Sequence, residues 1–73
     1  MFLHEAIKTI LDNFRSEDRL VATTSEICGE NRRLCLYIRK KDGMSPDASQ
    51  INARVRKHPE LFQFTGRGKV TLR

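Results

Sequence analysis

The sequence has no tryptophan, one tyrosine and only two cysteines, and its apolar stretches are short. A membrane-spanning helix needs about 20 consecutive apolar residues, so none is predicted. Proteins that hold single-stranded nucleic acid or RNA stack its bases on exposed aromatic rings. All four phenylalanines fall at positions of an apolar pattern, so no such aromatic platform is expected.

The two cysteines, Cys28 and Cys35, are not accompanied by a second cysteine pair. Taken with His4 and His58 they match no common zinc spacing, so neither a metal nor another cofactor is expected. We interpret both cysteines as small apolar packing residues. The start of the chain does not read as a secretion signal. The expected setting is therefore reducing and intracellular, in the cytoplasm and nucleoid or in the nucleus.

Patterns that support catalysis are absent as well. There is no pair of carboxylates on one element, no glycine-rich phosphate loop and no nucleophile pattern around either histidine. A chain of 73 residues predicts a single domain with little room for a buried catalytic pocket. We expect no enzyme but a monomeric binding module over residues 1–73, which is open to being one part of a larger protein.

The charge is unevenly distributed. Residues 1–31 hold three basic and six acidic residues, whereas residues 32–73 hold eleven basic and three acidic ones. The net charge of +5 therefore divides into −3 and +8. A basic half is typical of proteins that bind polyanions. The alternative is a surplus of cations that only keeps a small domain in solution, and charge alone does not decide between the two.

Apolar spacing and turn signals predict three helices and a hairpin. Apolar residues at three- and four-residue spacing, Phe2 to Phe14, indicate the first helix. The remaining elements are a short strand at Leu20-Val21, a helix over about 25–36, a charged turn at 39–43, a helix over 46–57 and a hairpin of 61–65 with 69–72. This order predicts an α+β winged helix-turn-helix, with a two- to three-stranded antiparallel sheet.

The helix over 46–57 has two unlike sides. Ser45 is the expected cap and Pro46 the expected first helical residue. A rotation of 100° per residue gathers Ala48, Ile51 and Val55 into a buried stripe. Polar, small and basic residues lie away from this stripe: Ser49, Gln50, Ala53 and Lys57 on the opposite side, with Arg54 and Arg56 on its flanks.

Such a face suits DNA, since amide and guanidinium groups read base edges and longer cations reach phosphates. The hairpin adds Arg67 between two glycines, and Lys69. The predicted DNA-binding residues are Ser49, Gln50, Ala53, Arg54, Arg56, Lys57, Arg67 and Lys69. An ordinary solvated helix and a tight exposed turn are the alternatives. Whether the basic turn at Arg39, Lys40 and Lys41 lies on the same side of the molecule is open.

Several segments taken in order resemble one family. They are FLHEAIKTIL, TTSEICGEN followed by LCLYIRKKDG, SPDASQINARV and PELFQFTGRGKVTL. The last is similar to a Phe-x-x-x-Gly-x-Gly-x-x-x-Leu ending, met here by Phe62, Gly66, Gly68 and Leu72. In these features almost the whole chain resembles the HARE-HTH domain. Val70 stands where that family often has an aromatic residue.

The resemblance implies a winged helix that binds duplex DNA as an accessory domain of a larger protein. The family occurs in the RNA polymerase delta subunit, in restriction endonucleases and in Additional-sex-combs-like chromatin proteins, so transcription regulation or restriction-modification is the implied context. By position, Ser49, Gln50, Ala53, Arg54 and Lys57 would face the groove and Arg67 would make the wing contact. Some members are thought to act through protein contacts, which leaves a protein-interaction role without DNA binding as the alternative.

Overall fold

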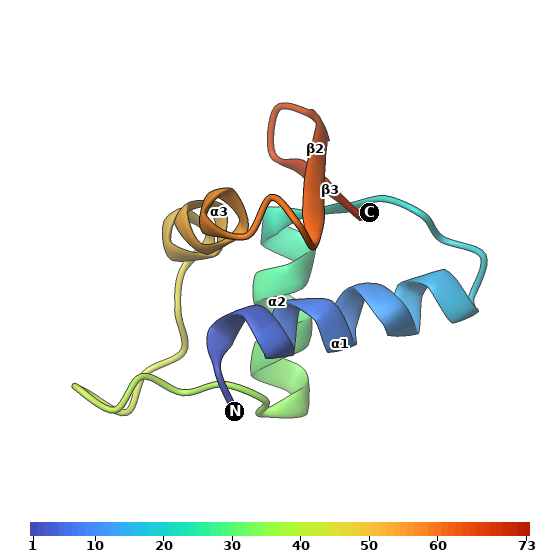
Figure 1. The fold of residues 1–73 in the computed structure, drawn as a ribbon. Helices are drawn as coiled ribbons and strands as arrows, with labels where there is room; N and C mark the ends of the chain where they lie inside the picture. Colours follow the sequence, from blue (N-terminus) through green and yellow to red (C-terminus); the bar gives the residue numbers. More distant parts are fainter.

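The computed structural model describes all 73 residues and consists of three helices and a small sheet (Figure 1). The elements are α1 (Leu3–Ser16), β1 (Ala22–Thr23), α2 (Thr24–Leu34), α3 (Ala48–Lys57), β2 (Phe62–Gly66) and β3 (Lys69–Leu72). The strands are antiparallel, in the spatial order β1-β3-β2. This α+β, winged-helix-like arrangement confirms the fold class predicted from the sequence.

The first helix, α1, buries one apolar side as predicted. The buried residues are Leu3, Ala6, Ile7, Ile10 and Leu11. Phe2, which the pattern placed in this stripe, is 69% exposed, so that part of the prediction is wrong. The reason is that Phe2 precedes the helix: its N–H donates to Oε1 of Glu5 at 2.7 Å, and its ring stacks on His4 outside the core.

The first strand lies two residues beyond its predicted position, at Ala22–Thr23 instead of Leu20-Val21. Asp18 has a φ of 62°, so the chain reverses after α1 before it becomes extended. Ala22 pairs with Val70 in the sheet and is buried there. Leu20 is left 66% exposed, and its carbonyl accepts a hydrogen bond from the Thr71 hydroxyl.

The second helix, α2, begins with a reciprocal cap. Oγ1 of Thr23 accepts from the N–H of Glu26 at 3.1 Å, and Oε1 of Glu26 accepts from the N–H of Thr23 at 3.0 Å. The helix ends before the predicted residue 36 because Cys35 takes a left-handed conformation with φ of 53°. Cys35 is therefore exposed, and its predicted packing role is wrong; Cys28 does pack against the core.

Asn31 is a buried amide on α2, only 1% exposed. Its Oδ1 accepts from the Tyr37 N–H at 2.9 Å, and its Nδ2 donates to the Tyr37 carbonyl at 3.0 Å. Residues 36–38 belong to no strand, so this side chain supplies the partners that a sheet would otherwise give. The amide thereby fixes the path of the connection between α2 and α3.

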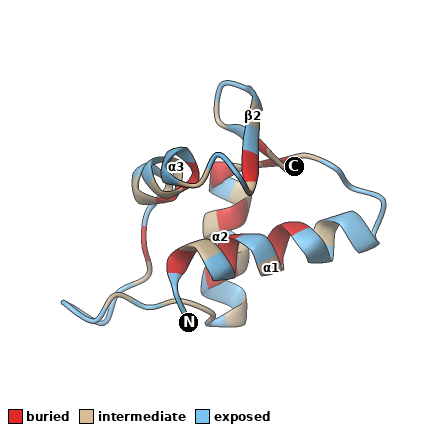
Figure 2. Ribbon diagram, in the orientation of Figure 1, coloured by how far each residue is buried: buried red, intermediate tan, exposed pale blue.

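All six elements contribute side chains to one core (Figure 2). The cluster comprises Leu3, Ile7, Ile10, Leu11, Ala22, Ile27, Ile51, Val55, Phe62 and Val70. The hairpin contributes Phe62 and Val70, and its register pairs Phe62 with Leu72 and Phe64 with Val70, as the alternating pattern predicts. None of the three helices combines the length and hydropathy that crossing a membrane requires.

Asn31→Ala should lower the free energy of unfolding by about 2 kcal/mol, because the backbone groups of Tyr37 lose their partners. Chemical denaturation followed by circular dichroism measures the change. Asn13→Ala is the matched control, since Asn13 is an exposed amide on α1. The control should change the free energy by less than about 0.5 kcal/mol. Equal effects of the two variants would show that the Asn31 amide does not hold the connection.

The capping carboxylate of α2 predicts a response to acid. The hydrogen bond from Arg19, and then that from the backbone of Thr23, lower the pKa of Glu26 from 4.5 to about 2. Stability from Glu26 is therefore complete above pH 4.5 and is lost as the pH falls toward 2. Glu26→Gln keeps an oxygen for the cap but not the charge, so its unfolding free energy should vary less over that interval.

Acid titration of the unfolding free energy tests this effect, with Glu17→Gln as the control. Glu17 is exposed and forms no ion pair. The control should keep the dependence on pH that the unaltered protein shows. The same dependence in Glu26→Gln would mean that the Arg19–Glu26 pair does not stabilise the fold.

Candidate nucleic-acid interface

The third helix, α3, begins later than predicted. Its cap is Asp47 and not Ser45, and Pro46 is buried just before the helix instead of being its first residue. Oδ1 of Asp47 accepts from the Gln50 N–H at 2.9 Å, and Oε1 of Gln50 accepts from the Asp47 N–H at 3.0 Å. Gln50 therefore uses its amide oxygen within the helix and keeps its NH2 group for another partner.

The exposed side of α3 carries small and basic residues. Ser49, Ala53, Arg56 and Lys57 are exposed, while Ile51 and Val55 are buried, as the helical pattern predicts. Ala48, predicted in the buried stripe, is half-buried. Because Ser49 and Ala53 have short side chains, another molecule can come close to the helix axis along this side.

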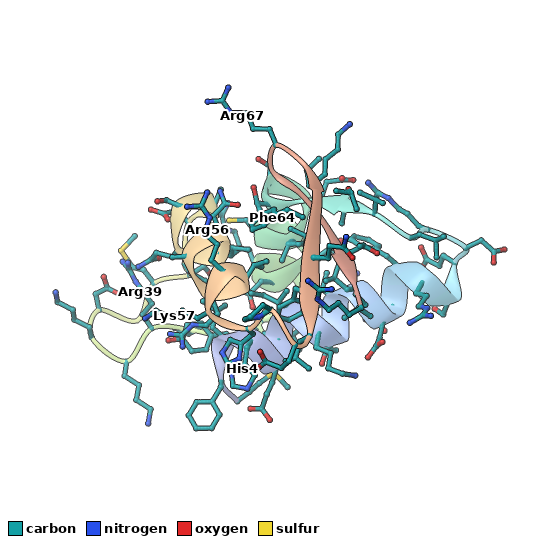
Figure 3. All side chains as sticks on the ribbon, turned by 45° about the horizontal axis from the view of Figure 1, so that its top comes forward. His4, Arg39, Arg56, Lys57, Phe64 and Arg67 are labelled. Carbon is teal, nitrogen blue, oxygen red and sulfur yellow. The ribbon has the colours of Figure 1, made fainter.

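One flank of α3 borders a cavity of about 190 Å³. From α3 it is lined by Gln50, Ala53, Arg54 and Lys57, and from the other elements by Leu3, Tyr37, Arg39 and Pro46. Arg39 thus lies beside α3 (Figure 3), which answers whether the basic turn shares this side of the molecule. Nε of Arg39 donates to Oδ1 of Asp42 at 3.1 Å, so its charge is compensated, whereas Lys40 and Lys41 form no ion pair.

The other flank of α3 faces the hairpin. The guanidinium carbon of Arg56 lies 5.8 Å from the centroid of the Phe64 ring. That distance is near the outer limit for a cation–π contact, so the ring orients the Arg56 side chain but does not compensate its charge. Arg54 and Arg56 therefore stand on opposite flanks, as the helical pattern predicts.

The hairpin tip presents Arg67 and Lys69. Both residues are exposed, and the Arg67 side chain extends away from the body of the protein (Figure 3). The Thr24 N–H donates to the Gly68 carbonyl at 2.9 Å, which ties the tip to the start of α2. Of the two glycines at the tip, only Gly68 has a positive φ, 68°, so the turn needs a glycine at that position and not at Gly66.

The cations of α3 and the hairpin have no acidic partners. The ion pairs are Lys8–Asp12, Arg19–Glu26, Arg33–Glu30, Arg39–Asp42 and His58–Glu60. None includes Arg54, Arg56, Lys57, Arg67 or Lys69. The positive potential of these five side chains is therefore not cancelled by ion pairing within the protein.

The sequence pattern missed a contact between the two histidines. His4 lies in the first turn of α1, and His58 is the residue at which α3 ends. The structure stacks their rings with centroids 4.2 Å apart, and Phe2 stacks on the other side of His4. Nδ1 of His58 lies 3.0 Å from the Glu60 carboxylate. The backbone N–H of Glu60, and next the His58 side chain, lower the pKa of that carboxyl. No signal in the sequence links residues so far apart along the chain.

Comparison of the chain with protein-family models, with curated proteins and with solved structures gave no match. The fold and the arrangement of the charged side chains are therefore what support a function.

Gly68→Ala should lower the free energy of unfolding by about 1 kcal/mol, because a residue with a Cβ is strained at positive φ. Gly66→Ala is the matched control: its φ is not positive, and the nearest atom to the added Cβ is Cδ of Lys69 at 3.7 Å, an ordinary contact. Urea denaturation of both variants measures the difference. Similar losses in the two would contradict the assignment of the turn to Gly68.

Proposed function

We propose that the protein is a duplex-DNA-binding accessory domain, with α3 in the major groove and the turn at residues 66–69 on the adjacent backbone or minor groove. The observation that carries this proposal is the set of five unpaired cations on α3 and the hairpin. They come from two separate elements, as the surfaces of a duplex require.

The chemistry of α3 defines what it would read. Because the Gln50 oxygen is held by Asp47, a bidentate contact with adenine would break the helix cap. Its free NH2 instead suits an acceptor, such as O6 or N7 of guanine or O4 of thymine. Arg54 is placed for guanine as well, and Ala53 for a thymine methyl group. Arg56 and Lys57 are the phosphate contacts.

The hairpin and the basic turn extend the charged track on either side of α3. Arg67 would enter or border the minor groove, and Lys69 would contact a phosphate. Lys40 and Lys41 would contact the backbone beyond the cavity, since Arg39 places their turn beside α3. These are five phosphate contacts, and about six with Arg67 at the border of the minor groove, enough for weak and strongly salt-dependent binding.

The fold agrees with the resemblance to the HARE-HTH family, and we propose membership of that family on the sequence features and the fold together. Val70, in place of the frequent aromatic, is fully buried in the sheet. The proposed setting is an intracellular one with access to DNA. There the domain would act as a monomer, attached to a larger chain in transcription, chromatin or restriction.

The alternative is a protein-interaction winged helix that does not touch DNA. Its expected mark is an apolar patch in place of a cationic helix face. The exposed side of α3 has no large apolar side chain, so it favours DNA. Large apolar residues are exposed at another place on the molecule, among them Phe2 and Ile38.

Fluorescence anisotropy with a labelled random-sequence duplex tests the proposal. The dissociation constant should fall in the non-specific range of roughly 10⁻⁴–10⁻⁶ M at physiological salt, with a log–log salt slope of about −5. Lys69→Gln and Lys57→Gln should each weaken binding and reduce that slope by about 1, since each removes one phosphate contact.

Lys8→Gln is the matched control. It removes the same charge from α1, where Lys8 is paired with Asp12 at 2.9 Å. The control should keep the affinity and the slope. Binding that ignores salt, or that weakens equally in all three variants, would contradict the proposed surface.

A further inference from the structure

A second surface lies between the start of α1 and the segment that follows α2. There a groove of about 560 Å³ is lined by Met1, Phe2, Glu5, Leu36, Tyr37, Ile38 and Lys40. Met1, Phe2 and Ile38 are among the five large apolar residues that the fold leaves exposed, at 66%, 69% and 49%. Three such residues gathered in one hollow differ from apolar residues scattered singly, which need no explanation.

Both walls of the groove are held in place. On one side, Asn31 binds the N–H and the carbonyl of Tyr37. On the other, the Phe2 N–H binds Glu5, and the Phe2 ring stacks on His4, which stacks in turn on His58. The Tyr37 backbone and the Phe2 ring are therefore pre-organised, which lowers the entropy lost when a partner binds.

The charges around the groove define the occupant. Lys40 lines it and Lys41 follows, and neither has an ion-pair partner. Glu5, the only carboxylate in the lining, is engaged by the Phe2 N–H. An occupant that matches this surface has apolar side chains for the floor and carboxylates for the lysines.

We propose that this groove docks a peptide segment of a partner protein in which apolar and acidic residues lie close together. Tyr37 lines both this groove and the cavity beside α3, so the two hollows adjoin, and Tyr37 is the one residue that their linings share. The domain would then hold a protein with one surface and leave α3 and the hairpin free. The inference does not depend on the proposed DNA binding.

The test uses the whole chain and three synthetic peptides of equal length. The first combines aspartate with leucine and phenylalanine, the second has serine in place of the apolar residues, and the third has lysine in place of aspartate. Tyr37 is the only tyrosine and there is no tryptophan, so its fluorescence reports the groove if the peptides lack both residues. Amide chemical shifts locate the binding site independently.

The first peptide should bind with shifts on residues 2–5 and 36–40, and the other two should bind at least about tenfold more weakly. Ile38→Ser and Phe2→Ser should each weaken the first peptide about tenfold, which corresponds to the loss of one buried apolar side chain. Leu20→Ser is the matched control: Leu20 is 66% exposed, lies outside the groove and should leave binding unchanged.

Four results would overturn the proposal. They are no binding of the first peptide, equal binding of the serine peptide, shifts confined to residues 49–57, and stronger shifts of the groove residues with a single-stranded oligonucleotide. Because Lys40 and Lys41 would serve both ligands, duplex DNA should weaken the peptide by competing for these lysines, while the shifts of residues 2–5 should remain. If the protein binds the peptide but does not bind duplex DNA, only the function proposed above is contradicted. The two failures are therefore distinguishable.

Discussion

The pair of hydrogen bonds between the Asn31 side chain and the backbone of Tyr37 is the constraint on which both candidate surfaces depend. Residues 35–47 have no sheet partner, and a segment of that kind needs its backbone groups satisfied if it is to hold one course. The Asn31 amide does this from the buried side of α2. An apolar side chain at this position would add buried apolar surface but would not fix the path of the segment. Because Tyr37 is fixed, Arg39 lies beside α3 and Ile38 lies in the apolar groove.

The rest of the protein consists of a small core and two surfaces of different chemistry. Only 14 of the 73 residues are buried, so little apolar surface is left for a pocket within the core. The acidic residues are used mostly within the first half, as helix caps and in ion pairs, and few remain to neutralise α3 and the hairpin. The uneven charge seen in the sequence thereby becomes a positive side of the molecule, while the apolar groove lies at the start of α1.

The sequence predicts the elements whose cause is local, and it fails where tertiary contacts decide. Helical spacing located α1 and the buried side of α3, and alternation located the hairpin, because each depends on neighbours along the chain. The position of β1 was missed because it follows from pairing with Val70, and the cap of α3 because Pro46 is taken up by the core. Cys35 was predicted to pack as a small apolar residue, but it ends α2 in a left-handed conformation. The role of Asn31 and the groove had no local signal, and the DNA-binding residues stay a prediction.

An NMR titration of labelled protein with a short random duplex, at low and then at physiological salt, tests the central claim most directly. The account predicts chemical-shift changes clustered on residues 49–57 and 66–69, which reverse as salt is added. The absence of shifts at low salt, or shifts confined to residues outside α3 and the hairpin, would contradict it.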